Sequence, residues 1–171
     1  MFLSRFALLA TFIAISNAVE AQEVPWNAPL VGPVILTVTG LDPERFPDGR
    51  QEFDVARLQS LGEDQITTSS MWTKGVHLYT GVMLRTLADH LIFDDRDLKL
   101  HALNDYAIDM PLSEATHEGP MLAYLLDGAQ MSVRDKGPIW VIYPFDSDAK
   151  FRKDQIYARS VWQLVRIEVL P

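Results

Sequence analysis

The stretch Met121-Leu122-Ala123-Tyr124-Leu125-Leu126-Asp127-Gly128 carries the clearest structural signal in this chain. Six apolar residues run together and end at an Asp-Gly pair, which favours the tight turn of a β-hairpin. The run is short and bounded by turn residues, which is typical of a buried strand rather than of a helix. We therefore predict a strand followed by a hairpin turn.

Further strands are predicted on both sides of this hairpin, wherever short β-branched or apolar runs are bounded by Gly, Pro or Asp. Their ranges are 34–39, 65–72, 98–103, 106–110, 139–143 and 161–169. Short helices are predicted over 55–61 and 82–91, and a helical turn over 111–115. Loops are predicted around 75–81, where two glycines occur, and over the charged segment 145–155. This order predicts an α+β fold, a single domain with a mixed, curved β-sheet and short helices.

The first residues indicate export. Arg5 precedes an apolar run of ten residues, Phe6 to Ile15, and Val19-Glu20-Ala21 offers small residues where a signal peptidase cleaves. The run is shorter than the ~20 residues that span a bilayer. We therefore expect a signal peptide over 1–21, one domain over 22–171, and a periplasmic or secreted protein.

The charge balance restricts the partners. The whole chain has a formal net charge of −8, which disfavours nucleic acid and anionic lipid as partners. No later segment is long and apolar enough to predict membrane insertion of the mature chain. The expected partners are a small-molecule ligand or a membrane-bound sensor or redox protein.

The chain has no cysteine, which excludes a thiolate nucleophile, an iron–sulfur cluster and a thiolate-held metal. Its four histidines are not spaced as a local metal site; they are His77, His90, His101 and His117. We predict no catalytic residue and no metal site from the residues themselves.

Several segments together resemble the sulfite-oxidase-type molybdopterin domain, from about residue 34 to the end. Taken in order, they are Ser69-Ser70-Met71-Trp72-Thr73 with Tyr79-Thr80-Gly81-Val82, Leu103-Asn104-Asp105-Tyr106 with Met110-Pro111-Leu112, Met121 to Gly128, Gly137 to Pro144, and Tyr157 to Val169. Each segment is weak alone, whereas their order and spacing are specific. The resemblance implies a single α+β domain that clasps a molybdopterin cofactor.

The resemblance also implies that one cysteine holds the metal, and that this position falls near Thr68 or Ser69. Both carry a hydroxyl, which is neither soft nor easily ionised. Exported members of the family usually carry a twin-arginine signal, whereas Arg5 stands alone. The chain thus resembles a short exported variant that lacks the metal-ligand cysteine. We expect no cofactor, or molybdopterin if a hydroxyl replaces the sulfur.

The resemblance and the residue types together define a candidate ligand pocket. Its expected members are Thr68, Ser69, Trp72, Asn104, Tyr106, Tyr143, Arg159 and Ser160. Trp72 and Tyr143 would provide apolar platforms, whereas Asn104 and Arg159 would orient a polar or anionic group.

Ordinary structural roles compete with these assignments. Trp140 and Trp162 are expected to pack in the core, while Trp72 fits the core and a pocket equally well. Residues 104–106 also fit an Asx-type turn.

Three functions remain open from the sequence. The first is a cofactor-free module that binds a small ligand and acts as a sensory or accessory protein. The second is a molybdopterin-dependent oxidoreductase with a hydroxyl in place of the cysteine ligand. The third is a scaffold without a ligand.

Overall fold

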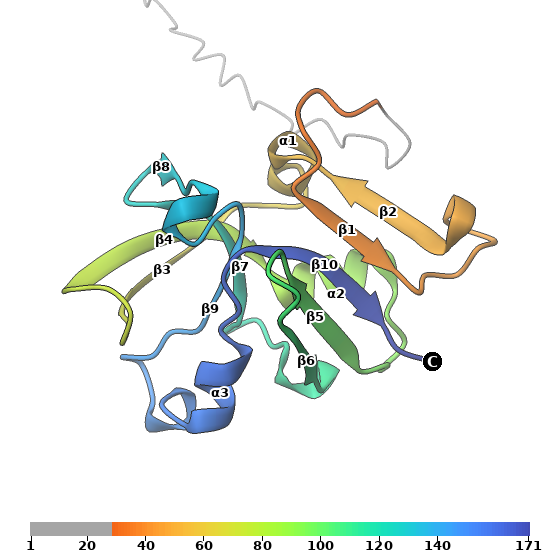
Figure 1. The fold of residues 1–171 in the computed structure, drawn as a ribbon. Coiled ribbons are helices and arrows are strands. Elements are labelled where there is room, and N and C mark those ends of the chain that lie inside the picture. The colour runs from red at the N-terminus through yellow and green to blue at the C-terminus, as the bar shows by residue number, and fades with distance from the viewer. Residues whose placement is uncertain (1–28) are drawn as a thin grey trace, which may run out of the picture.

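The computed structural model describes residues 29–171 (Figure 1). The predicted signal peptide over 1–21 lies outside the described residues, as do Pro25, Trp26 and Asn27. The strands form two five-stranded sheets, which we call sheet A and sheet B.

Sheet A has the strand order β2-β1-β10-β5-β6. Its strands are β1 (Leu36–Thr39), β2 (Arg50–Phe53), β5 (Leu98–Ala102), β6 (Ala107–Met110) and β10 (Leu164–Val169). β1 and β10 run parallel, whereas the other neighbours are antiparallel. Sheet A is therefore mixed, as the sequence predicts.

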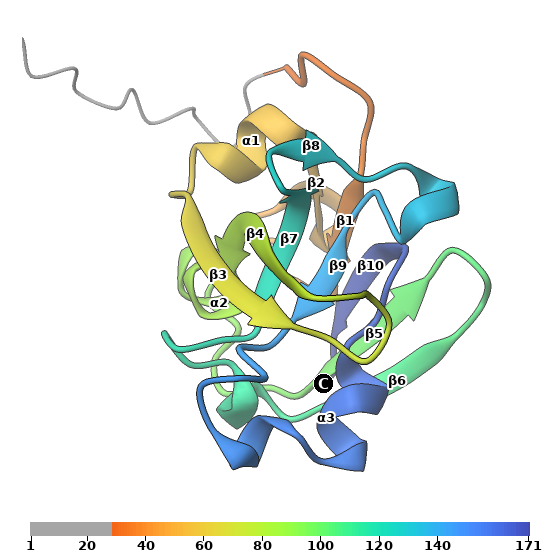
Figure 2. The same cartoon turned by 90° about the vertical axis from the view of Figure 1, so that its left-hand side faces the viewer.

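Sheet B is antiparallel and faces the viewer in Figure 2. Its strands are β3 (Asp64–Ser69), β4 (Val76–Met83), β7 (Met121–Leu126), β8 (Ala129–Gln130) and β9 (Trp140–Ile142). β7 and β8 form the hairpin predicted from the sequence. Asp127 and Gly128 both have positive φ, 50° and 79°, as a type I′ turn requires.

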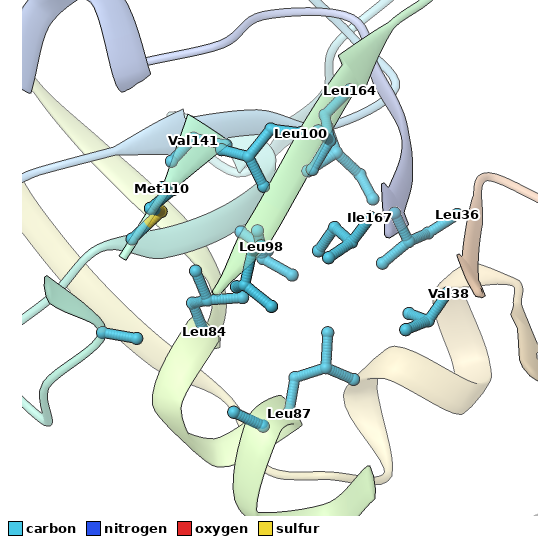
Figure 3. Packing of buried hydrophobic residues seen from close by; sticks show 14 of the residues in the cluster. Leu36, Val38, Leu84, Leu87, Leu98, Leu100, Met110, Val141, Leu164 and Ile167 are labelled. Carbon is cyan, nitrogen blue, oxygen red and sulfur yellow. The ribbon is translucent and has the colours of Figure 1, made fainter. Parts of the chain in front are cut away.

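The core lies between sheet A and the helix α2 (Leu84–Leu91). Leu84, Leu87, Ala88 and Leu91 are buried at spacings of three and four residues, which places them on one helix face. Figure 3 shows Leu84 and Leu87 pointing toward the buried side chains of sheet A. Burying such leucines contributes about 1.5–3 kcal/mol each, so this contact anchors the domain.

Two shorter helices lie at opposite ends of the fold. α1 (Val55–Gln59) begins at Asp54, whose carboxylate accepts a hydrogen bond from the backbone nitrogen of Arg57. α3 (Asp154–Arg159) lies near β6 (Figure 1) and leads into β10. Single 3₁₀ turns occur at Pro47–Gly49, Leu112–Glu114, Val133–Asp135 and Ala149–Phe151.

The loop predicted around 75–81 is wrong, because these residues belong to β4. Gly81 is needed within this strand: a Cβ there would lie 2.1 Å from the carbonyl oxygen of Leu122 on β7. The pairing of β4 with β7 also shifts register between Thr80 and Gly81. A glycine inside a strand thus marks a close backbone approach rather than a loop.

Two further expectations need correction. The segment predicted as a surface loop over 145–155 contains the 3₁₀ turn Ala149–Phe151, and α3 begins before its end. The last strand begins at Leu164 rather than at Val161. In addition, β2 had not been predicted.

The fold class is confirmed: a single α+β domain with a mixed, curved arrangement of strands and three short α-helices. Within residues 29–171, no helix has the length and apolar character needed to cross a bilayer.

Candidate functional site

A cavity of about 270 Å³ opens between three segments that lie far apart in the sequence. The β3–β4 loop contributes Trp72, and the segment from α3 to β10 contributes five residues of the wall. The end of β5 and the β5–β6 turn contribute Ala102, Asn104 and Tyr106. We call it the aromatic pocket, and its lining residues are Trp72, Ala102, Asn104, Tyr106, Tyr157, Ala158, Ser160, Val161 and Trp162.

Trp72 is the centre of the aromatic wall. Its ring centroid lies 5.6 Å from that of Trp162 and 5.8 Å from that of Tyr157, and both pairs meet edge to face. It also meets the fully buried Trp140 at 5.9 Å and Phe145 at 6.3 Å. Such edge-to-face pairs are favourable and directional. The loop that carries Trp72 is therefore held against the domain by its own aromatic side chain.

The polar groups of the aromatic pocket divide into structural and available ones. Ser160 is 2% exposed; its hydroxyl donates to the carbonyl of Val141 at 2.6 Å, and its carbonyl accepts from the indole of Trp140 at 3.3 Å. Asn104 uses its side-chain oxygen to accept from the backbone nitrogen of Tyr106 at 3.2 Å. Ser160 is thus part of the wall, whereas the Asn104 amide nitrogen has no hydrogen-bond partner among residues 29–171.

The structure agrees with both interpretations of Asn104 and Tyr106, a turn between strands and a place in the pocket wall. The hydrogen bond between them forms an Asx-type turn, and both residues also line the aromatic pocket. The turn is closed further by the Tyr106 hydroxyl, which donates to the carbonyl of Ala158 at 3.1 Å. This bond joins the β5–β6 turn to the end of α3 across the pocket.

Thr68 and Ser69 lie at the end of β3 and are both bound to Asp146. The backbone nitrogen and the hydroxyl of Ser69 donate to the Asp146 carboxylate, and the fully buried Thr68 hydroxyl accepts from the Asp146 backbone nitrogen at 3.1 Å. The backbone bond from Ser69, followed by its side-chain bond, lowers the pKa of Asp146 below its usual 3.8. We call these three residues the Asp146 clamp.

The Asp146 clamp does not fit a molybdenum ligand. A hydroxyl would have to lose its proton to bind the metal, yet the Ser69 hydroxyl donates to a carboxylate that stays ionised. A negative neighbour opposes a second negative charge. Thr68 is fully buried and already accepts a hydrogen bond. Neither oxygen has the softness or the ready ionisation of a thiolate.

Tyr143 and Arg159 lie elsewhere. Tyr143 is 1% exposed and lines a second, more polar cavity of about 560 Å³ beside Glu114, Lys150 and Phe151. Its burial raises the pKa of its phenol. Arg159 donates to the carboxylate of Glu114 and to the carbonyl of Asp109, so it does not face the aromatic pocket as an anion-binding group.

The eight residues predicted from the sequence therefore separate into three places. Trp72, Asn104, Tyr106 and Ser160 line the aromatic pocket. Thr68 and Ser69 form the Asp146 clamp, while Tyr143 and Arg159 belong to the second cavity and its border.

Two aromatic residues of the pocket were missed. The sequence does not place Tyr157 among the candidates, because its helix follows a charged segment that is predicted as a surface loop. In the structure its ring faces Trp72. Trp162 was expected in the core, yet it is only partly buried and lines the pocket. Trp140, by contrast, is confirmed as a core residue.

His77 fixes the loop that carries Trp72. Its Nδ1 lies 2.7 Å from a carboxylate oxygen of Asp127, and its Nε2 lies 2.8 Å from the carbonyl oxygen of Lys74. Both partners only accept hydrogen bonds, so the geometry suits an imidazolium with two N–H donors. The bond to Asp127 and then the bond to Lys74 raise the pKa of His77 above its usual 6.5.

No group of three or more metal-ligating side chains gathers within the described residues. The aromatic pocket is also lined without any charged side chain. What these residues provide is an apolar wall with a few hydrogen-bonding groups, which is the usual make-up of a small-ligand site.

Comparison with known proteins supports the fold and leaves the activity open. No family model matches the chain, and no curated protein matches it. Among solved structures, it is similar to the sulfane dehydrogenase SoxCD from Paracoccus pantotrophus, with 14% sequence identity and a TM-score of 0.54. The match covers 78% of this chain but 37% of that chain. At this identity the similarity shows the fold alone.

Proposed function

We propose that this protein is an exported ligand-binding module of the molybdopterin-domain type that works without the metal cofactor. Its aromatic pocket takes a small molecule, and the domain passes this event to a membrane-bound sensor or redox partner as a sensory or accessory protein. The observation that carries the proposal is the arrangement of Trp72, Tyr157 and Trp162 around one cavity.

The aromatic pocket has the features of a binding site rather than of a packing defect. It is bordered by segments from three parts of the chain, and Tyr106 and Trp162 expose apolar surface there. Binding sites commonly lie on loops held by a rigid scaffold. Here the scaffold is sheet A on one side and a second buried cluster on the other. That cluster consists of Ile66, Tyr79, Met121, Ala123, Met131, Trp140 and Ile142.

The Asp146 clamp supports the cofactor-free part of the proposal. It uses the hydroxyls that would have to replace the missing cysteine, and it uses them to join β3 to the segment after β9. Likewise, Arg159 is paired with Glu114 instead of being available for a phosphate.

A competing function is a molybdopterin-dependent oxidoreductase with a hydroxyl ligand, because the chain is similar in fold to a sulfane dehydrogenase. Elemental analysis of the full chain, purified from its native compartment, separates the two. The proposal expects no stoichiometric molybdenum, whereas about one molybdenum atom per chain would establish the competing function.

Ligand binding is tested on the same preparation with naphthalene, an uncharged planar probe. Titration should shift the backbone amide resonances of residues around Trp72 and Trp162 and raise the melting temperature, because a ligand that prefers the native state stabilises it. Shifts confined to the second cavity would refute the aromatic pocket as the site, as would the absence of any shift with both naphthalene and chromone, a flat probe with a ring carbonyl.

A further inference from the structure

The aromatic pocket also indicates which chemical class it selects, an inference that rests on the proposed function. We infer that it binds an uncharged, flat ring compound that carries a carbonyl oxygen at its edge. Three features of the pocket lead to this class: its neutrality, the geometry of its aromatic wall, and the unused amide donor of Asn104.

The neutrality follows from where the charges lie. None of the lining residues is charged. Arg159, on the same helix turn as Ala158, is turned away to Asp109 and Glu114. Lys136 lies over the ring of Trp162 with its nitrogen 4.9 Å from the centroid, and it also faces Trp140 at 5.4 Å. Lys136 is not among the lining residues. A carboxylate or phosphate would therefore find no charged side chain in the pocket lining to pair with, which is costly in an apolar site.

The wall suits a flat molecule. Trp72 stands at 77° to Trp162 and at 84° to Tyr157, so the indole and its neighbours form a corner of nearly perpendicular planes. A planar ligand that lies along one plane presents its edge to the other, which is the preferred geometry of aromatic pairs. The volume of about 270 Å³ is slightly below the usual range for drug-sized ligands, so a molecule of one or two rings fits.

The unused donor is the amide nitrogen of Asn104. The Asx-type turn fixes which side-chain atom is the oxygen, because Tyr106 donates its backbone nitrogen to it at 3.2 Å. The amide nitrogen then carries two N–H groups without an acceptor among residues 29–171. The Tyr106 hydroxyl donates to Ala158, so of the two side chains that the β5–β6 turn places at the pocket, Asn104 is the one that offers a donor to a ligand. A carbonyl oxygen on the ligand is the acceptor that suits it.

Three probes of similar size separate the effect of a ring carbonyl on affinity from the effect of a negative charge. Chromone is flat and uncharged and has a ring carbonyl, naphthalene lacks the carbonyl, and 2-naphthoate carries a negative charge. We expect chromone to bind about three- to tenfold more tightly than naphthalene, which corresponds to one hydrogen bond of ordinary net strength. We expect 2-naphthoate to bind more weakly than both. Dissociation constants are measured by amide chemical-shift titration of the full chain.

The variant Asn104→Asp isolates the donor. Aspartate keeps the oxygen that accepts from Tyr106, and so keeps the turn, but it removes both N–H groups. The advantage of chromone over naphthalene should disappear in this variant. Asp105→Asn is the matched control, because Asp105 neighbours the site in the same turn without lining the pocket and its positive φ of 66° tolerates asparagine. It should leave the advantage unchanged.

The outcomes distinguish this inference from the proposed function. Equal affinity for chromone and naphthalene, tightest binding of 2-naphthoate, or a chromone advantage that survives in Asn104→Asp would each overturn the ligand class while the pocket remains a binding site. If no probe shifts the resonances around Trp72, the proposed function itself fails and the ligand class fails with it.

Discussion

The carboxylate of Asp146 accepts two hydrogen bonds from Ser69, one from its backbone nitrogen at 2.6 Å and one from its hydroxyl at 2.7 Å. The two residues are 77 positions apart in the sequence. Their contact joins the end of β3, just before the loop that carries Trp72, to the segment that follows β9. The position at which the resemblance implies a metal ligand is thus a structural junction of this fold.

We expect Asp146→Asn to lower the free energy of unfolding at neutral pH by about 1 kcal/mol, the usual net contribution of such hydrogen bonds. Because the pKa of Asp146 is lowered from 3.8 in the folded state, its contribution is present above that value and is lost as the pH falls through the folded pKa. Urea unfolding measured from about pH 6 down to about pH 2 should therefore show a flatter acid limb for Asp146→Asn than for the natural chain. The control variant Asp105→Asn should lose stability at acid pH as steeply as the natural chain does. If its acid limb were as flat as that of Asp146→Asn, the hydrogen bonds to Asp146 would not be the source of this pH dependence.

His77 should give a pH dependence of the opposite sign. Its pKa is raised above 6.5 by Asp127 and Lys74, so its contribution is complete below 6.5 and is lost as the pH rises through the folded pKa. We expect the natural chain to lose about 0.5 kcal/mol across this window, as for an exposed ion pair, and His77→Gln to lose none of it. Urea midpoints between about pH 5.5 and about pH 9 provide the measurement. His117→Gln is the control, since His117 is exposed and should keep the natural profile.

Gly81→Ala should destabilise the domain strongly, by about 3 kcal/mol. The new Cβ would lie 2.1 Å from the carbonyl oxygen of Leu122 and 2.7 Å from the Cα of Ala123; both are backbone atoms, so β4 and β7 would have to separate. Gly32→Ala is the matched control, because there the nearest atom is a side-chain oxygen of Asp54 at 3.7 Å. Thermal unfolding of both variants compares them directly. A small effect at Gly81 would mean that the two strands are not paired as described.

Trp72→Ala should lower the free energy of unfolding by about 2 kcal/mol, less than for a fully buried tryptophan because the side chain is half-buried. It removes four edge-to-face contacts at once. Trp72→Phe should recover most of the loss, since a smaller ring keeps part of the apolar contact. Guanidinium unfolding gives the energies, and near-ultraviolet circular dichroism reports the loss of aromatic packing. Equal losses for the two variants would show that ring contact does not matter at this position.

Local patterns in the sequence were sufficient for the elements with strong periodicity or turn chemistry. The β7–β8 hairpin follows from an apolar run that ends in Asp127-Gly128, and the buried face of α2 follows from the spacing of its leucines. Both signals are local, so they can be recognised without knowledge of the tertiary structure.

The errors arise where a tertiary contact decides the local structure. Gly75 and Gly81 suggested a loop, but Gly81 lies inside β4 because β7 passes too close for any side chain. α3 follows a charged segment whose polarity suggested a loop, and it is held by the packing of Tyr157 against Trp72 and Phe145. Neither neighbour is visible in the local sequence.

The candidate site was predicted in part for the same reason. Residue types and order identified Trp72, Asn104, Tyr106 and Ser160, all of which line the aromatic pocket. They could not indicate that Arg159 faces Glu114. The direction in which a side chain of a short helix points depends on how the helix is oriented in the fold, and the local sequence does not contain that orientation. Trp162 was assigned to the core since a tryptophan in an apolar run usually packs there, whereas it lies just before β10 begins.

The parallel pairing of β1 with β10 has a consequence for biosynthesis. β10 occupies the middle of sheet A, between β1 and β5, although it is the last of the described strands to leave the ribosome. Until Val169 has emerged, β1 and β5 have no shared neighbour, and the strand edges that pair with β10 stay unpaired. Sheet A therefore stays incomplete in the nascent chain until β10 has been made, a state that a chaperone can bind.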